Sequence, residues 1–248
     1  MGLTAEERGR LRVVLVRTRN PLNIGAAARA MANFGFRHLR LVEPYEAAFR
    51  GARSAVNAEA VLQAAETFAD VAEAVADCAL VVGTAEGRQR TTEEPLQRLE
   101  QVVEEIRRHL RSGARVAVLF GSEKRGLSNL ELSPCQRVLR IPTEAEQPSM
   151  NLGQAVAVVL YEVIRERAAT AAAGAEIPLA TAGDRERLIS LLVEALERSG
   201  GMQEGEGVAV EEKARRLVRH MALTGSDAHA WMGLLRQILW KLKGGTDR

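Results

Sequence analysis

The sequence predicts an α/β domain with a largely parallel sheet, followed by a small all-α domain. Short apolar runs alternate with amphipathic stretches from Arg12 to Arg167, which is the pattern of strands joined by crossover helices. After Arg167 an alanine-rich stretch leads into three amphipathic segments that contain no strand-like run. We therefore expect a sheet domain over 1–167, a linker over 168–183 and a helical domain over 184–248.

The strands of the sheet domain are expected where short apolar runs precede turn-forming loops, at 12–16, 38–42, 79–82, 116–120 and 138–141. Apolar residues at helical spacing predict helices between them, at 24–34, 47–65, 71–76, 95–110 and 151–167. Residues 1–11 are polar and are expected to fray. In the helical domain we expect helices at 184–199, 209–223 and 227–243, the last capped by Ser226 or Asp227.

Composition limits the possible functions. The 248-residue chain has a formal net charge of only +2, so a nucleic-acid surface must come from local clustering of basic residues. Cys78 and Cys135 are too few for a disulfide framework or a four-cysteine zinc site, and the four histidines show no metal-ligand spacing. No signal sequence and no membrane-spanning run is evident. We therefore expect a cytoplasmic protein with no bound metal and no membrane contact.

Two strand ends are expected to deliver polar loops to one edge of the sheet. The first loop follows Phe120 and contains Gly121 and Gly126; the second follows Ile141 and runs into a helix with Asn151 as its N-cap. Glycines let a backbone approach a ligand closely, so this edge is a candidate binding site, although ordinary turn glycines give the same pattern. The first strand is not followed by the GxGxxG motif of Rossmann dinucleotide sites, and the GxxxxGK[ST] motif of P-loops does not occur. The strongest signals for these two kinds of site are therefore missing.

Basic residues form three candidate sites for phosphate. Arg29 lies on the side of its helix away from the core, and Arg88 with Arg90 lies in a glycine-containing loop. Residues 213–243 hold seven basic residues and one acidic residue, a local charge of +6. That charge suits RNA or DNA. Solvated surface charges are the alternative for each cluster: they are the more common explanation of a lone arginine such as Arg29, and they account for the basic tail as well as nucleic-acid binding does.

Three blocks, taken together, resemble a known family. They are Asn20 to Arg29 (NPLNIGAAAR), Phe120 to Leu127 (FGSEKRGL), and Ile141-Pro142 with Ser149 to Leu152 (SMNL). In this order they resemble the motifs of the SpoU (TrmH-type) branch of the SPOUT RNA methyltransferases. The resemblance extends over nearly the whole chain. It includes the strand end Gly83-Thr84, the following Arg88 and Arg90, and the basic tail at 214–219 and 234–238. Within the family they resemble the enzymes that methylate the ribose of nucleotide 32 in the tRNA anticodon loop.

The resemblance implies a C-terminal trefoil knot in the sheet domain, S-adenosylmethionine as methyl donor, tRNA as substrate and an obligate homodimer. It places cofactor contacts at Thr84, Ala85, Glu86, Gly121, Ile141, Pro148, Ser149 and Met150. It places Arg29, Asn23 and Ser149 in catalysis, and Arg88, Arg90, Arg215, Arg216 and Arg219 in RNA binding. For the dimer contact we expect the flat helix side formed by Gly153, Ala157 and Tyr161.

The chemistry implied is displacement at a sulfonium methyl group by a ribose hydroxyl, which needs proton removal or oxyanion stabilisation. No histidine is placed to act as base, and Arg29 stays protonated, so we expect Arg29 to stabilise charge and position phosphate. Two alternatives remain open: a SpoU-type enzyme that acts on rRNA or another tRNA position, and a non-catalytic RNA-binding module.

Overall fold

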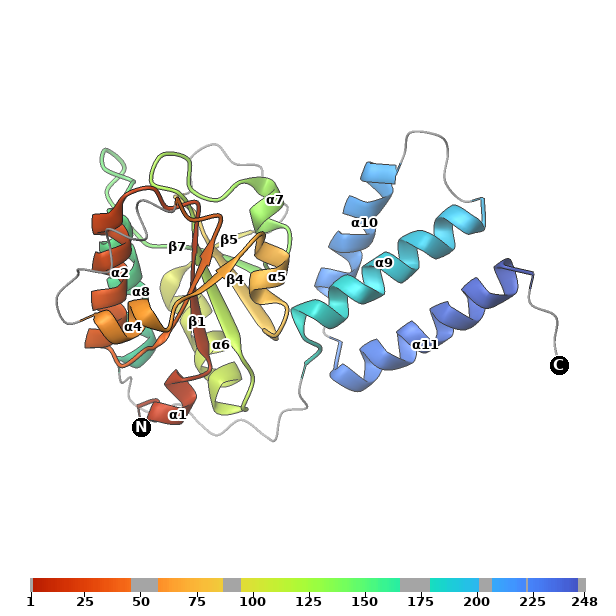
Figure 1. The fold of residues 1–248 in the computed structure, drawn as a ribbon, viewed down its shortest axis with the longest axis horizontal. Helices are drawn as coiled ribbons and strands as arrows, with labels where there is room; N and C mark the ends of the chain where they lie inside the picture. The colour runs from red at the N-terminus through yellow and green to blue at the C-terminus, as the bar shows by residue number, and fades with distance from the viewer. Residues whose placement is uncertain are drawn as a thin grey trace. The chain divides into compact units, whose positions relative to one another are not determined.

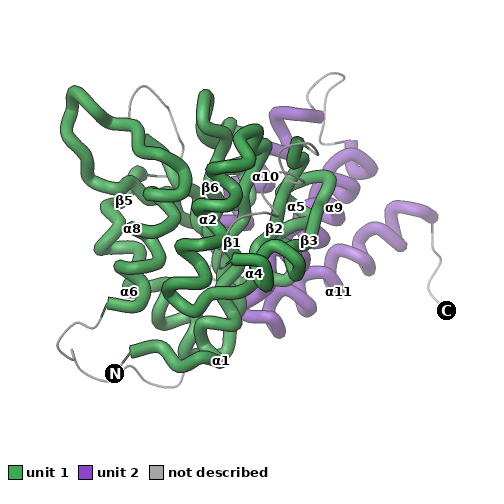
Figure 2. The backbone as a smooth tube through the Cα atoms, turned by 60° about the vertical axis from the view of Figure 1, so that its left-hand side comes forward, with its two compact units in different colours: residues 1–176 green, residues 177–248 purple. Residues whose placement is uncertain are grey.

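A computed structural model describes residues 2–45, 58–86, 95–165, 179–200, 207–221 and 223–244. The chain forms two compact units, residues 1–176 and 177–248 (Figure 2). Each unit has a hydrophobic core of its own.

The first unit is built on a sheet of seven parallel strands in the order β3-β2-β1-β6-β4-β7-β5. The strands are β1 (Leu11–Val16), β2 (His38–Val42), β3 (Glu66–Phe68), β4 (Leu80–Thr84), β5 (Leu96–Arg98), β6 (Val116–Phe120) and β7 (Arg137–Arg140). Although β6 follows β1 and β4 in the chain, it is inserted between them. Because all strands are parallel, the loops that leave β1, β4, β6 and β7 meet at one edge.

Helices cover both faces of the sheet, as a parallel sheet requires. The larger core lies under α2 (Pro21–Asn33), α4 (Glu59–Gln63), α6 (Leu99–Arg111) and α8 (Leu152–Ile164). The short helices α5 (Val71–Val75) and α7 (Asn129–Leu132) lie on the opposite side of the sheet from α2 and α8 (Figure 1). Alternate residues of β1, Leu11, Val13 and Leu15, belong to the larger core, which matches the two-residue period of a strand.

Several elements differ from the sequence prediction. Residues 5–8 form the helix α1 (Ala5–Arg8), because Thr4 and Glu7 make a capping box, so fraying of the whole N-terminal segment is wrong. Leu96–Arg98 is the edge strand β5, paired with β7, instead of the first turn of α6. The sequence also gave no sign of β3, a three-residue strand with no fully buried residue. Much of the helix expected at 47–65 lies outside the described residues.

The second unit contains α9 (Ala182–Arg198), α10 (Gly207–His220) and α11 (Gly225–Leu242). Both α10 and α11 pack on α9, and its Leu188 and Ile189 are buried together with Val218 of α10 and Leu235 of α11. The N-cap of α11 is Thr224, whose hydroxyl accepts a hydrogen bond from the Asp227 amide; neither Ser226 nor Asp227 is the cap. Asp227 instead supplies the N3 carboxylate of a capping box.

Helices α2 and α8 approach each other closely within the chain (Figure 1). A Cβ atom added to Gly153 would lie 2.5 Å from the Cβ of Ala26. Ala157 packs against the same core, and the Tyr161 ring lies 6.2 Å from that of Phe34 at the end of α2. The helix side expected to contact a second copy therefore packs along α2, so that expectation was wrong for Gly153.

This crossing predicts a size-exchange effect. Gly153→Ala should lower the free energy of unfolding by about 1–3 kcal/mol, because the added methyl group overlaps Ala26. The double variant Ala26→Gly/Gly153→Ala moves the methyl group from one helix to the other and should recover part of that loss. Urea unfolding of the two single variants and the double variant measures the coupling. Strictly additive changes would contradict the contact.

Candidate active site

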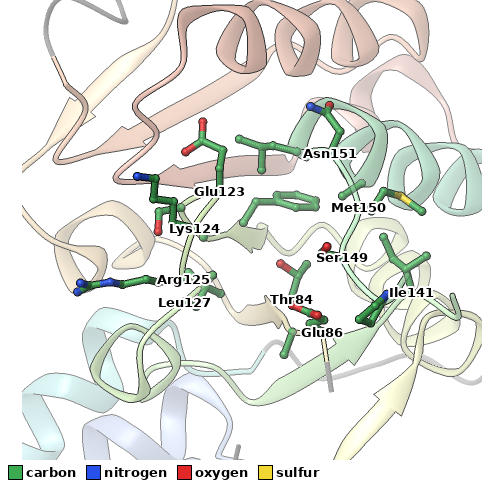
Figure 3. A pocket seen from close by; sticks show the side chains of 18 of the residues that line it. Thr84, Glu86, Glu123, Lys124, Arg125, Leu127, Ile141, Ser149, Met150 and Asn151 are labelled. Carbon is green, nitrogen blue, oxygen red and sulfur yellow. The ribbon is translucent and has the colours of Figure 1, made fainter. Parts of the chain in front are cut away.

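The loops at the carboxyl edge of the sheet surround a cavity of about 460 Å³, within the usual range for small-molecule sites. It lies where β6 is inserted between β1 and β4, next to the point at which the strand order reverses. Its walls come from the end of β4 (Thr84 to Glu86), the loop 120–127, the segment 139–151 and the start of α8. Figure 3 shows Thr84 and Ser149 near its centre.

A chain of side-chain hydrogen bonds joins three segments that are far apart in the sequence. The amide nitrogen of Asn23 donates to Glu123 Oε1 at 3.0 Å, and Asn23 Oδ1 accepts from the side-chain amide of Asn151 at 2.8 Å. The backbone amide of Asn20 also donates to Glu123 Oε1, at 3.2 Å. Asn151 in turn caps α8 by accepting from Gly153 N at 3.0 Å. Asn23 thus fixes the β6 loop and the N-terminus of α8 relative to α2.

The Glu123 carboxyl is held in its charged form by this arrangement. Partial burial by itself raises its pKa, but hydrogen bonds from the Asn23 amide and from backbone amides, including those of Asn20 and Arg19, outweigh that effect. The pKa of Glu123 therefore lies below its ordinary value of 4.5. A carboxylate with a lowered pKa is a weak base near neutral pH, so this group is suited to positioning and not to proton removal.

The β6 loop can form only with glycine at its first position. A Cβ on Gly121 would lie 2.0 Å from the carbonyl carbon of Gly126, inside the backbone of the same loop. Gly126 itself has φ +62° and donates its amide to Ser122 O at 2.8 Å. The chain therefore turns back tightly over residues 122–126, and this turn carries Glu123, Lys124 and Arg125 to the cavity wall.

All eight residues expected to contact a cofactor lie in the wall of this one cavity: Thr84, Ala85, Glu86, Gly121, Ile141, Pro148, Ser149 and Met150. The hydroxyl hydrogen of Thr84 is engaged within the sheet, because it is donated to Leu119 O at 2.9 Å. Asn23 also lines the cavity. Residue patterns did not single out Glu123, although its place two residues after a strand-end glycine is the signal that could have found it.

The basic residues expected in the site behave differently from one another. Arg29 is exposed on α2 and does not line the cavity of its own chain. Arg88 and Arg90 lie outside the described residues. Arg215 is engaged within its own unit: it donates to both oxygens of Glu186 at 2.6 and 2.7 Å and to Glu211 at 2.8 Å. Burial lowers the pKa of Arg215, but these two carboxylates outweigh it and raise the pKa above its ordinary value.

The remaining tail arginines, Arg216 and Arg219, lie on α10; Arg216 is exposed and Arg219 is half-buried. Across the parts of the chain that the structure describes, no cluster of three or more His, Cys, Asp or Glu residues could hold a metal ion. Among the same residues, none of the helices is both long enough and apolar enough to cross a membrane.

Comparison with known proteins decides the family. The model of the SpoU rRNA Methylase family matches residues 10–161, a range that includes every residue lining the cavity. The chain belongs to the SpoU methylase family. The family match covers the sheet unit and ends before the three-helix unit begins.

Individual relatives within the family extend the match. The tRNA (cytidine/uridine-2'-O-)-methyltransferase TrmJ of Citrobacter koseri is 33% identical over 245 residues, 94% of this chain and 98% of that protein. A TrmJ of Pseudomonas aeruginosa, named for cytidine, uridine and adenosine, is 41% identical over 155 residues, 62% of this chain and 60% of that protein. The crystal structure of TrmJ from Z. mobilis matches with a TM-score of 0.78 and 31% identity, covering 92% of this chain and 98% of that one.

The Glu123 hydrogen bonds predict a pH-dependent contribution to stability. Because the folded-state pKa is lowered, the carboxylate stabilises the fold above its ordinary pKa, and this contribution is lost as pH falls through the folded-state value. Glu123→Gln should therefore be less stable than the wild type from about pH 6 upward, with a difference that shrinks below about pH 4.5. Urea unfolding at a series of pH values measures this.

Glu86→Gln is the matched control, because Glu86 is an exposed carboxylate of the same cavity wall. The pH dependence assigned to the Glu123 hydrogen bonds is the part of the Glu123→Gln difference that Glu86→Gln does not show. A Glu123→Gln difference that stays constant down to acid pH would show that the hydrogen bonds to Glu123 do not favour its charged form.

Proposed function

We propose that this protein transfers a methyl group from S-adenosylmethionine to the ribose 2'-hydroxyl of a tRNA nucleotide, at position 32 of the anticodon loop. The observation that carries the proposal is the assembly of the three motif segments around one cavity, joined by the Asn23, Glu123 and Asn151 side chains. The TrmJ relatives, which are named as tRNA 2'-O-methyltransferases and match nearly the full chain, support tRNA as the substrate. A tRNA substrate is in keeping with a cytoplasmic protein.

The chemistry of the cavity wall fits the cofactor. Apolar side chains of Phe120, Leu139 and Ile141 suit the adenine, and the carboxylates of Glu86 and Glu123 suit a positively charged donor. The backbone of the 121–127 and 141–150 segments lines the same space, so amides and carbonyls can recognise the cofactor without further side chains. When bound, S-adenosylmethionine supplies an electrophilic methyl group on its sulfonium.

The protein's own residues then have to position the ribose hydroxyl and stabilise its charge. Ser149 is exposed in the cavity wall, so its hydroxyl can hydrogen-bond the ribose. Asn23 has both polar atoms engaged, by Glu123 and Asn151, and so acts by holding the two loops in place. Glu123 is a poor base at neutral pH. We therefore assign the main catalytic effect of the side chains to an arginine that stabilises the charge on the ribose oxygen.

That arginine is Arg29, and we propose that it acts in the cavity of a second subunit. In its own chain Arg29 is exposed and does not line the cavity, and among the described residues it has no hydrogen-bond or ion-pair partner. It shares the outer side of α2 with Leu22, which is 77% exposed. An exposed leucine beside an arginine that has no partner supports a homodimer formed through α2.

The fold proposal includes a C-terminal trefoil knot. The insertion of β6 between β1 and β4 supports it, as does the return of the chain from β7, past the 121–127 loop, to pack α8 on α2. Residues 184–248 are proposed as a tRNA-binding domain after a linker over 168–183. Lys213 and Arg216, both exposed on α10, support that role, whereas Arg215 is proposed to stabilise the unit.

A second candidate function is methylation of rRNA, which the name of the matching family favours. Nucleoside mapping separates it from the first. Purified tRNA and ribosomal RNA, both from a strain lacking the gene, would be incubated with the protein and S-adenosylmethionine, and the methylated position would be read by mass spectrometry. Methylation of rRNA alone would favour the second candidate, and no binding of S-adenosylmethionine would exclude both.

The role of Arg29 predicts a separation of binding from chemistry. Arg29→Ala should bind S-adenosylmethionine as the wild type does, because Arg29 does not line the cavity of its own chain. Methyl transfer to tRNA should fall by about 100-fold or more, the scale of losing an electrostatic stabiliser. Calorimetry measures the first quantity and single-turnover transfer the second. Equal losses in both would contradict this role.

Mixed dimers test which subunit supplies the arginine. Ser149→Trp should fill the cavity, so Arg29→Ala and Ser149→Trp are each inactive alone. If Arg29 acts across the dimer, a mixture of the two variants forms hybrid dimers. In each hybrid the open cavity of the Arg29→Ala subunit receives the intact Arg29 of the Ser149→Trp subunit, so activity reappears. A mixture that stays inactive although hybrids form would place Arg29 in its own chain's site or outside catalysis.

The three-helix unit predicts a loss of tRNA affinity on truncation. A chain cut after residue 167 should bind S-adenosylmethionine unchanged, because every cavity residue precedes the cut. It should bind tRNA more weakly, since phosphate contacts supply much of the affinity. In the full chain, Lys213→Glu with Arg216→Glu should reproduce that loss, as measured by fluorescence anisotropy.

Arg215→Glu gives the contrasting result. It places a third carboxylate beside Glu186 and Glu211, so it should destabilise the contact between α9 and α10. Its main effect should appear in thermal unfolding. Unchanged unfolding of Arg215→Glu, or full tRNA affinity in the truncated chain, would contradict these assignments.

A further inference from the structure

Three basic residues lie on two neighbouring loops at the carboxyl edge of the sheet, and two of them line the cavity. Lys124 and Arg125 belong to the tight turn after β6 and form part of the cavity wall. Arg19 lies in the loop after β1. Its backbone amide donates to Oε2 of Glu123, the residue that precedes Lys124, at 3.4 Å. All three side chains are exposed. We call Arg19, Lys124 and Arg125 the basic rim.

The Lys124 and Arg125 side chains are directed away from the centre of the cavity. Figure 3 shows Lys124 and Arg125 extending away from Ser149 and Ile141, while Glu123 lies between Lys124 and the Asn151 side of the site. The Glu123 carboxylate is occupied by Asn23 and by the Arg19 and Asn20 amides. The acidic residue of the turn therefore accepts its hydrogen bonds from uncharged amides.

Two residues of the rim, Arg19 and Lys124, differ from the arginines of the sheet unit that are held in ion pairs. Arg17, two residues before Arg19, is paired with the buried Glu131 at 2.8 Å, and Arg40 is paired with Asp77 at 2.6 Å. Within the described ranges, by contrast, neither Arg19 nor Lys124 has an ion-pair partner. Exposed cations whose charge is not offset by a paired carboxylate favour the approach of an anion to a nearby binding cavity.

We infer that the basic rim binds backbone phosphates of the RNA next to the nucleotide whose ribose enters the cavity. This rests on the proposed function, because the ligand is taken to be the tRNA substrate. A ribose placed at the cavity carries a phosphate on either side, and these phosphates must lie outside the cavity. Lys124 and Arg19 donate to such groups without sequence preference, so the rim adds affinity and register and leaves base specificity to other residues.

The test measures the salt dependence of tRNA binding in the full chain. Lys124→Ala and Arg19→Ala should each reduce the slope of log affinity against log salt concentration by about one unit, and the double variant by about two. Binding of S-adenosylmethionine, measured separately by calorimetry, should not change in Arg19→Ala, because Arg19 does not line the cavity. Arg37→Ala is the matched control, because Arg37 is exposed just before the N-terminal end of β2, at the opposite edge of the sheet.

The outcomes separate this inference from the proposed function. If the wild type binds tRNA but the slopes of the rim variants equal those of the wild type and Arg37→Ala, the inference fails and the function stands. If Lys124→Ala weakens cofactor binding and leaves the slope unchanged, the rim holds the cofactor carboxylate and the inference is again wrong. If the wild type binds no tRNA, both fail together.

Discussion

The site depends on one carboxylate, that of Glu123, which is held by hydrogen bonds from uncharged amides. A parallel sheet brings the loops after β1, β6 and β7 to the same edge, but it does not fix their distances from one another. Glu123 and Asn23 do this, because Glu123 accepts from the β1 loop and from Asn23, and Asn23 accepts from Asn151. Loss of one partner would leave a partly buried polar group unsatisfied, so the three loops are positioned together.

Close backbone approach is the second constraint on the site. Gly121 allows the turn after β6 to fold back on its own backbone, and Gly153 allows α8 to approach Ala26 of α2. Both glycines belong to segments that surround the cavity, since Gly121 lines it and Gly153 follows the lining residues Asn151 and Leu152. Glycine is needed at these positions for steric reasons alone, and hydrogen bonds then fix the side chains around them.

The sequence predicted the central strands and missed those at the edges. β2 and β6 were predicted with their observed bounds because β6 is wholly buried and apolar, and β2 has four buried residues, three of them apolar. β3 and β5 have three residues each, and none of these residues is fully buried. They are strands because they pair with β2 and β7, and their composition gives no signal for a strand. Tertiary context overrides local pattern in such elements.

In the site, the resemblance to a family identified the residues of the cavity wall, but the sequence could not show which polar groups pair. A count of charges over 213–243 treats Arg215 and Arg216 alike. Folding separates them, because Arg215 lies between Glu186 and Glu211 while Arg216 is exposed on the same helix.

The same reasoning applies to the whole chain, whose net charge is only +2. Arg40 is held by Asp77, and Arg107 donates to the backbone carbonyls of Val163 and Arg165 at the end of α8. Such residues stabilise the fold and contribute little to attraction of a distant polyanion, since their charge is offset or largely buried. In the proposed function, attraction of RNA depends on cations that folding leaves exposed, such as Lys124 beside the cavity and Lys213 on α10. A nearly neutral protein can in this way present basic surface where a phosphate backbone has to lie, without the self-repulsion of a uniformly basic chain.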